Sequence, residues 1–102
     1  MKPEFIKVAQ PNIGDKEIEA VRDVLLSGNY VSGAKVEEFE ATFANYIGVD
    51  YAIAVNSGTA ALHIALEALG IQQGDEVIVP AMTFFATISA VLYLRAVPVF
   101  AD

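Results

Sequence analysis

The chain has 102 residues, 55% of them apolar and 19% charged, with a formal net charge of −7, one histidine and no cysteine. It is long enough for one domain with a core, and its scattered basic residues argue against a nucleic-acid partner, which requires a positive surface. Because it also lacks a membrane-length apolar run, a signal-peptide core and a set of metal ligands, we expect a soluble, cytoplasmic protein without a membrane partner or a metal centre.

The first half of the chain predicts an arm followed by two amphipathic helices. Residues 1–13, with a short extended piece at 5–8, are interpreted as an arm that packs on its own domain or on a second subunit. A first helix opens at Gly14 with Asp15 as its cap and ends at Gly28, and a second spans 33–48. Each has an apolar stripe at helical spacing, formed by Ile18, Val21 and Leu25 in the first and by Val36, Phe39, Phe43 and Tyr46 or Ile47 in the second.

The second half alternates strand and helix patterns. Apolar strands are predicted at 51–55, 76–79 and 97–101, with helices at 58–69 and 85–94 between them. Strands joined by helices of this length pair in parallel with right-handed crossovers. The fold class is therefore α/β, with two helices and then β-α-β-α-β.

The apolar surface of this arrangement exceeds what two crossover helices can cover. The strands are apolar on both faces, and the helix at 85–94 is apolar almost all round. We therefore expect residues 14–102 to be the first, incomplete part of a larger domain. The alternative is a small complete domain that covers itself by forming oligomers.

The loop after the first predicted strand suits an anion. Residues 56–59 combine small polar side chains, including the hydroxyls of Ser57 and Thr59, with the start of a helix. The unpaired N–H groups and the positive dipole end of a helix favour a phosphate there. Helix capping alone would also favour Ser or Thr at these positions.

The loop after the second predicted strand carries an aromatic residue. Phe84 lies between the hydroxyl-bearing residues Thr83 and Thr87, and ligands in open parallel sheets sit at the carboxyl ends of strands. The two loops could therefore border one site for a flat, phosphorylated ring. The structural alternatives are a core position for Phe84 and helix contacts for the two threonines.

Three familiar phosphate or nucleophile motifs fail on spacing. The dinucleotide fingerprint requires three glycines at the first turn, where only Gly58 is present. A triphosphate loop requires a lysine after its glycines, and no lysine follows Lys35. A nucleophile elbow around Ser57 requires glycines where Val55 and Thr59 stand.

The order of segments resembles the N-terminus of DegT/StrS-type nucleotide-sugar aminotransferases, which are fold-type-I pyridoxal-phosphate enzymes. The resemblance covers nearly the whole chain and rests on PNIGDKEIEAVRDVLLSGNYVSGAKVEEFE, NSGTAALHIAL, GDEVIVPAMTFFAT and AVPVFAD. Two departures are peripheral: Ala34 stands where the family often has Pro, and Arg95–Ala96 stands where Gly-Ala is common. The resemblance implies that residues 14–102 are the N-terminal part of the large PLP-binding domain.

The resemblance also implies roles for particular residues. Ser57, Gly58, Thr59 and Ala60 would hold the phosphate of pyridoxal 5′-phosphate, and Phe84 would stack on its pyridine ring. For His63, packing or an interface contact is the preferred interpretation, and for Tyr30 a surface position. No catalytic residue is expected in this segment, because the Schiff-base lysine and the acid that pairs with the ring nitrogen lie downstream in the family. Four lysines and the C-terminal acid match neither of them: Lys2, Lys7, Lys16, Lys35 and Asp102.

The function implied by the resemblance is amino transfer to a nucleotide-linked keto sugar, commonly from glutamate, in the biosynthesis of polysaccharide or antibiotic sugars. Family members form homodimers with paired sites. Two alternatives stay open. One is a PLP- or PMP-dependent sugar dehydratase of the same family, in which the Schiff-base lysine is replaced. The other is a non-enzymatic binding or regulatory module, although the chain has no basic groove for nucleic acid.

Overall fold

The computed structural model describes residues 8–102. The chain divides into two compact units, and the boundary along the sequence falls between Ala52 and Ile53. Most of the predicted arm, including nearly all of its extended piece at 5–8, lies outside the described residues. Residues 8–13 are exposed and have no regular secondary structure. In residues 8–102, no helix is both long and apolar enough to cross a bilayer.

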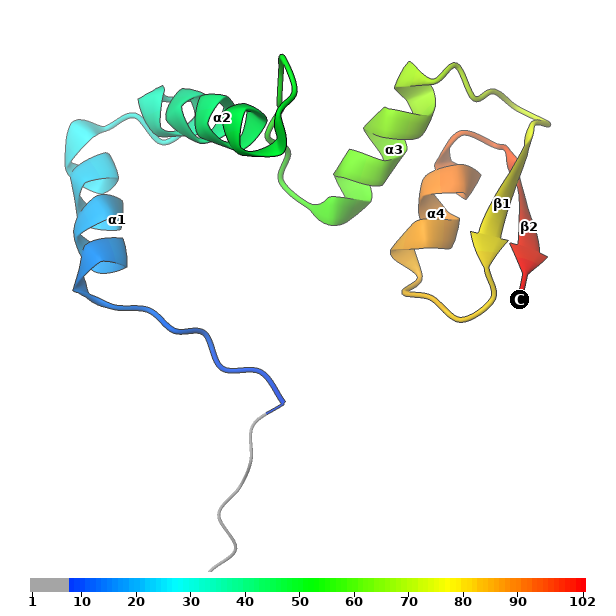
Figure 1. Cartoon of the computed structure of the whole chain (residues 1–102), viewed down its shortest axis with the longest axis horizontal. Coiled ribbons are helices and arrows are strands. Elements are labelled where there is room, and N and C mark those ends of the chain that lie inside the picture. The colour runs from blue at the N-terminus through cyan, green and yellow to red at the C-terminus, as the bar shows by residue number, and fades with distance from the viewer. Residues whose placement is uncertain (1–7) are drawn as a thin grey trace, which may run out of the picture. The chain divides into compact units, whose positions relative to one another are not determined.

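The first unit contains the two predicted helices, α1 (Asp15–Ser27) and α2 (Ala34–Ile47) (Figure 1). Gly28 and Gly48 follow them with φ angles of 75° and 83°, as predicted for left-handed helix ends. The prediction of Asp15 as the N-cap of α1 is wrong by one residue. Gly14 is the N-cap, and its N–H donates to Glu17 Oε2 at 2.7 Å. Asp15 is therefore the first residue of the helix and not its cap.

The apolar stripes of the first unit have the predicted spacing and stay largely exposed within that unit. Ile18, Val21 and Leu25 are each 59% exposed, and Ala44 is the one buried residue in the described part of this unit. Phe39 and Phe43 contact each other, with ring centroids 5.7 Å apart. Most of the apolar surface of α1 and α2 therefore faces outward.

The second unit contains α3 (Gly58–Ala68), β1 (Glu76–Pro80), α4 (Ala86–Tyr93) and β2 (Val97–Ala101), all close to their predicted bounds. The strands pair in parallel, from Glu76 opposite Val97 to Pro80 opposite Ala101. Backbone bonds extend the pairing beyond both ends: Val97 N–H donates to the Asp75 carbonyl at 2.8 Å, and Ala81 N–H donates to the Ala101 carbonyl at 3.0 Å.

The prediction of a first strand at 51–55 is wrong for the described chain, where these residues form no strand. A strand is defined by the ladder that it shares with a neighbour, and β1 and β2 pair only with each other within residues 8–102. Tyr51 and Ile53 are 86% and 80% exposed, so apolar composition alone did not bury this segment.

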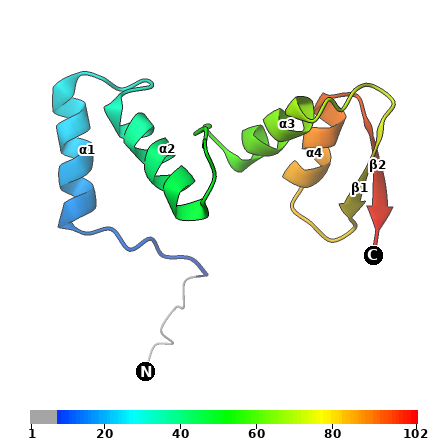
Figure 2. The ribbon, with the colours of Figure 1, turned by 45° about the horizontal axis from the view of Figure 1, so that its top comes forward.

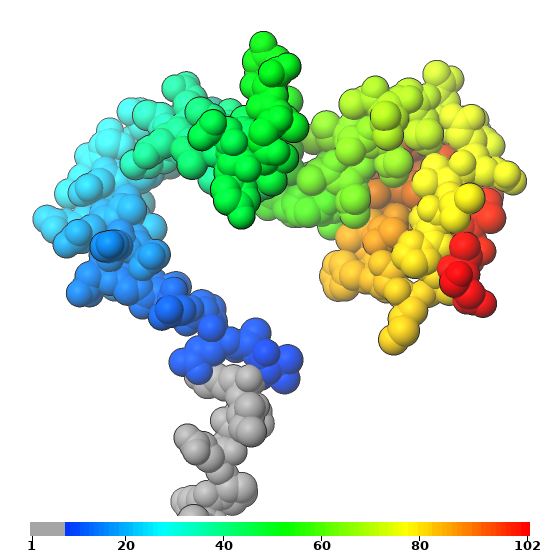
Figure 3. All heavy atoms as spheres, viewed as in Figure 1, coloured from blue at the N-terminus to red at the C-terminus, as the bar shows by residue number. Residues whose placement is uncertain are grey.

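Helix α4 forms the centre of the second unit. It packs against α3 on one side and against both strands on the other, as two views of the ribbon agree (Figures 1 and 2). In the space-filling view its orange spheres lie among those of α3 and the strands (Figure 3). Val79, Val91 and Ala96 form the buried core, and Val91 has no exposed surface. This two-sided packing explains why α4 is apolar almost all round.

The turn between α4 and β2 holds Arg95 in the left-handed region, with φ of 57°. Its N–H donates to the Leu92 carbonyl at 2.9 Å, and its carbonyl accepts from Gly74 N–H at 3.2 Å, so the conformation is fixed from both sides. Side chains with a Cβ disfavour this region. The structure thus gives a physical reason for the Gly-Ala pair that the resemblance associates with this position.

We expect Arg95→Gly to raise the free energy of unfolding by about 0.5–1 kcal/mol, because relief of the left-handed strain outweighs the extra entropy of glycine in the unfolded chain. Urea unfolding followed by circular dichroism measures this change. Arg95→Ala is the matched control, since it removes the charge and keeps the strained Cβ. Equal stabilisation by both variants would contradict the backbone explanation.

Candidate functional site

The start of α3 presents backbone donors that the helix itself does not use. Ser57 is the N-cap, and its Oγ accepts the N–H of Ala60 at 3.2 Å, while its carbonyl accepts the N–H of Ala61 at 3.0 Å. The N–H groups of Gly58 and Thr59 have no protein partner among residues 8–102. Two neighbouring donors therefore remain available at the positive end of this helix.

The first turn of α3 differs from those of α1 and α2 in charge. Its first turn contains no Asp or Glu, whereas the first turn of α1 contains Asp15 and Glu17 and that of α2 contains Glu37. Carboxylates in a first turn complement the positive dipole end and repel an incoming anion. Of these three helix starts, α3 is therefore the one whose local charge favours an anion.

Gly58 has no conformational requirement within the described chain. It does not adopt a positive φ, and a Cβ added to it would meet no atom within 4 Å. A side chain here would instead project into open space next to the two available N–H groups. The glycine leaves the backbone accessible to a bound group, which is a common use of glycine at anion sites.

The start of α3 and the loop before α4 border a common cleft of about 680 Å³. Phe84 lies in that loop with 80% of its surface exposed, so it does not belong to the core that residues 8–102 form. The N-terminal ends of α3 and α4 lie at the same end of the second unit (Figure 1). The cleft is lined by Gly58, Thr59, Ala61, Leu62, Ala65, Phe84, Ala86 and Thr87.

The cleft gathers part of the predicted set. Gly58, Thr59, Phe84 and Thr87 line it, while Ser57 and Ala60 lie beside it and bond each other. Thr83 does not line the cleft. Sequence reasoning missed four apolar residues that line the cleft: Ala61, Leu62, Ala65 and Ala86. For the three in α3, the spacing of three and four residues along one helix face could have indicated them.

The cleft carries no charged side chain, although the chain has a net charge of −7. Its polar groups are N–H donors and threonine hydroxyls. The rest of its lining is apolar, with two large side chains, Leu62 and Phe84, among alanines. In residues 8–102, no group of three His, Asp or Glu side chains is arranged to hold a metal ion. The groups that line the cleft suit an aromatic ring that carries a phosphate.

His63 and Tyr30 have contacts within their own units. The His63 ring packs on that of Tyr93, with centroids 5.4 Å apart and planes at 60°, which joins α3 to α4. The Tyr30 ring is 66% exposed, and its hydroxyl donates to the Leu25 carbonyl at 3.2 Å. These packing and surface positions agree with the interpretations preferred for the two residues.

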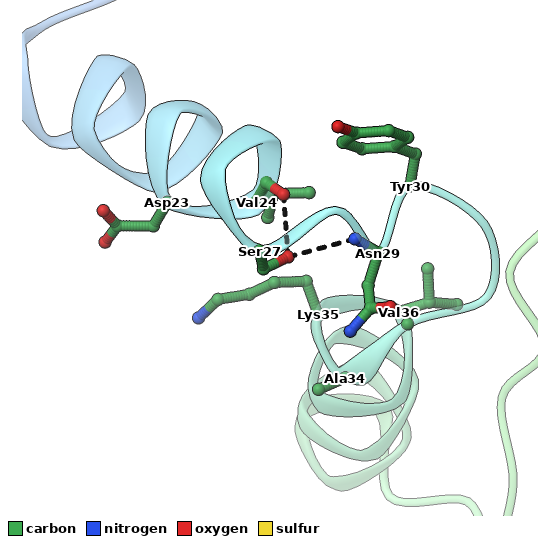
Figure 4. A pocket seen from close by; sticks show the side chains of 9 residues that line it. Asp23, Val24, Ser27, Asn29, Tyr30, Ala34, Lys35 and Val36 are labelled. Atoms are coloured by element: carbon green, nitrogen blue, oxygen red, sulfur yellow. Dashed lines mark hydrogen bonds between the residues drawn. The ribbon is translucent and has the colours of Figure 1, made fainter.

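A second hollow, of about 290 Å³, lies between the end of α1 and the start of α2 (Figure 4). Ser27 Oγ there donates to the Val24 carbonyl at 2.8 Å and accepts from Asn29 N–H at 3.2 Å, so its hydroxyl closes the helix end. Lys35 Nζ lies 2.6 Å from Glu38 Oε2. The hydrogen bond to Glu38 raises the pKa of Lys35, which opposes its use as a nucleophile, since a nucleophilic lysine requires a lowered pKa.

Comparison with known proteins gives long matches. The profile of the DegT/DnrJ/EryC1/StrS aminotransferase family matches residues 11–102. An aminotransferase from Psychrobacter cryohalolentis is 48% identical, with a TM-score of 0.84 over 90% of this chain and 24% of its own. A putative sugar aminotransferase from Streptococcus pneumoniae, solved in its PMP form, is 40% identical, with a TM-score of 0.91 over 95% of this chain and 24% of its own.

A third similar structure is the GDP-4-keto-6-deoxy-D-mannose-3-dehydratase of E. coli with bound hydrated PLP. It is 31% identical, with a TM-score of 0.86 over 93% of this chain and 26% of its own. The chain thus spans about a quarter of the length of these structures. The neighbours also confirm the α/β fold class and its place at the N-terminal part of a fold-type-I domain. Since the family profile covers nearly the whole chain, the chain belongs to the DegT/DnrJ/EryC1/StrS aminotransferase family.

Proposed function

We propose that this chain is part of a pyridoxal 5′-phosphate-dependent aminotransferase that acts on a nucleotide-linked keto sugar, with glutamate as the amino donor. The observation that carries the proposal is the cleft in which Gly58 and Thr59 border the same space as Phe84. Phosphate donors beside an aromatic side chain fit a flat ring with one phosphate. The similar Streptococcus pneumoniae protein, solved in PLP and PMP forms, supports this cofactor. When bound, the cofactor provides the electron sink for amino transfer.

The phosphate would lie at the start of α3. Gly58 and Thr59 would donate their free N–H groups, and the hydroxyls of Thr59 and Ser57 would add two further donors. Ser57 Oγ already accepts from Ala60 N–H at 3.2 Å, so Ala60 would contribute to the positive helix start without donating directly. Phe84 would cover the face of the pyridine ring and exclude water from it.

The reacting amine would come from a longer polypeptide. Residues 53–102, which contain the cleft, include no lysine, and the hydrogen bond to Glu38 raises the pKa of Lys35 in the other unit. Residues of this chain would therefore bind and orient the cofactor without transferring protons. The acid that pairs with the ring nitrogen would likewise lie outside residues 1–102.

A sugar dehydratase of the same family is the second candidate, favoured by the 31% identity to the E. coli dehydratase. The residue that separates the two is the Schiff-base lysine, which the dehydratases replace. The sequence that follows Asp102 in the whole protein decides between them, because a lysine in the family's context specifies an aminotransferase.

A homodimer is the proposed assembly, and the exposed stripes of the first unit support it. Ile18, Val21 and Leu25 form an apolar row that is more than half exposed in the first unit, and such surfaces mark interfaces. A cytoplasmic location and a role in polysaccharide or antibiotic sugar biosynthesis belong to the same proposal and stay predictions.

A chain limited to these 102 residues should not transfer amino groups. We expect purified material of verified mass, mixed with pyridoxal 5′-phosphate and glutamate, to form 2-oxoglutarate no faster than free pyridoxal 5′-phosphate does, because no lysine accompanies the cleft. The full-length enzyme is the positive control. Faster turnover by the 102-residue chain would refute the placement of the catalytic amine outside it.

Gly58→Ala should separate folding from phosphate binding. In the full-length enzyme, alanine in the first turn of α3 should raise stability by up to about 1 kcal/mol, because a Cβ there meets no atom of residues 8–102 within 4 Å. The same Cβ should raise the Kd for pyridoxamine 5′-phosphate about tenfold by obstructing charge-assisted bonds to the phosphate. This probe has no aldehyde for a lysine, so its Kd, measured by fluorescence titration, reports non-covalent contacts alone.

The matched control is Gly14→Ala, which changes the helix-start glycine of α1 in the other unit. It should leave the Kd for pyridoxamine 5′-phosphate unchanged. If Gly58→Ala also leaves that Kd unchanged, the phosphate does not lie at the start of α3.

Phe84→Ala should weaken pyridoxamine 5′-phosphate binding to the full-length enzyme about tenfold or more, since stacking of a ring on an aromatic side chain is worth about 1–3 kcal/mol. Phe85→Ala is the matched control, because Phe85 is the exposed neighbour that does not line the cleft. Equal loss of affinity in both variants would indicate a general disturbance of the loop and contradict stacking on Phe84.

A further inference from the structure

The loop that carries Phe84 is closed by a bond between two side chains. Thr83 Oγ1 and Thr87 Oγ1 lie 2.9 Å apart, with Thr83 in the loop after β1 and Thr87 in the first turn of α4. The backbone closes the same segment, since Thr87 N–H donates to the Phe84 carbonyl at 3.0 Å. Phe84 thus lies in a segment whose two flanking threonines bond to each other through their hydroxyls.

This hydroxyl bridge is not a helix cap. Phe85 occupies the N-cap position of α4 with helical backbone angles, and no side chain there accepts a backbone N–H. Ordinary capping by threonine would satisfy one of those N–H groups. Thr83 instead bonds to the Thr87 side chain, so the bridge fixes the loop relative to the helix and leaves the helix donors as they are.

The Phe84 ring requires some such constraint. With 80% of its surface exposed, it has little packing to fix its direction. Thr87 is half-buried and lines the cleft together with Phe84, so one end of the bridge belongs to the cleft wall. Fixing a contact residue before its ligand arrives lowers the entropy lost on binding.

We propose that the bridge between Thr83 and Thr87 positions Phe84 so that its ring borders the cleft before the cofactor binds. Thr83 and Thr87 are positioning residues in this scheme, and Thr83 acts on the ligand through Phe84. The inference rests on the proposed function, because it assumes that Phe84 contacts the cofactor ring.

The test measures the Kd of the full-length enzyme for pyridoxamine 5′-phosphate, together with the induced circular dichroism of the bound ring. Thr83→Val removes the hydroxyl and keeps the side-chain shape, and should raise the Kd about threefold to tenfold, the effect of one neutral hydrogen bond. Thr83→Ser restores the hydroxyl and should bind within about twofold of the unchanged enzyme, with its dichroism preserved. Thr42→Val, which removes a hydroxyl from α2, is the matched control.

Two further comparisons separate positioning from general stability. Thr87→Val removes the other partner, so it should match Thr83→Val, and the variant with both changes should bind no more weakly than either. In a Phe84→Ala background, Thr83→Val should have no further effect on the Kd, because its action passes through the ring. Additive losses with Phe84→Ala, or an unchanged Kd for both valine variants, would overturn the inference and leave the proposed function intact.

Failure of the proposed function has a different signature. If Phe84→Ala itself leaves the Kd unchanged, the ring does not contact the cofactor, and both the stacking role and the positioning role are wrong. Thermal unfolding of each cofactor-free variant identifies any that are misfolded. If Thr83→Val is misfolded, Thr87→Val and Thr87→Ser replace the Thr83 pair. The inference then requires a higher Kd for Thr87→Val and a nearly unchanged Kd for Thr87→Ser.

Discussion

The packing of α4 between α3 and the paired strands is the constraint on which the candidate site depends. Val91 is completely buried there, in contact with Val79 of β1 and Ala96 before β2. Because this contact fixes α4 between the other elements, the start of α3 and the loop before α4 border one space. The candidate binding residues are exposed, whereas the residues that bring them together are small and apolar and lie in the core of the second unit.

The charge of the cleft differs from that of the chain as a whole. The net charge is −7, yet the cleft contains no carboxylate and the first turn of α3 contains none. Acidic residues open α1 and α2 instead. The proposed anion site therefore needs no lysine or arginine, because its donors are backbone groups and the first turn that presents them carries no carboxylate.

Most elements were predictable from the sequence because their signals are local. Glycines at 28, 48 and 70 mark helix ends, and alternating strand and helix patterns identify β1, α4 and β2. The strand at 51–55 was predicted wrongly because a strand requires a neighbour, which local composition cannot specify. Loop chemistry indicated Ser57, Gly58, Thr59 and Phe84 as candidate residues, and their binding roles stay predictions. Their division into capping and cleft-lining residues required atomic distances, and the bond between Thr83 and Thr87 has no sequence signal beyond four-residue spacing.

The hydroxyl of Ser57 has a thermodynamic consequence. It closes the first turn of α3 by accepting from Ala60 N–H at 3.2 Å, and its own proton reaches only a distant acceptor, Asn56 Oδ1 at 3.4 Å. A phosphate at this turn would bind a conformation that exists only while α3 is folded. Ligand occupancy and folding of the helix would then be linked by mass action, and each tenfold rise in free ligand above its Kd would add about 1.4 kcal/mol to the stability of the folded state.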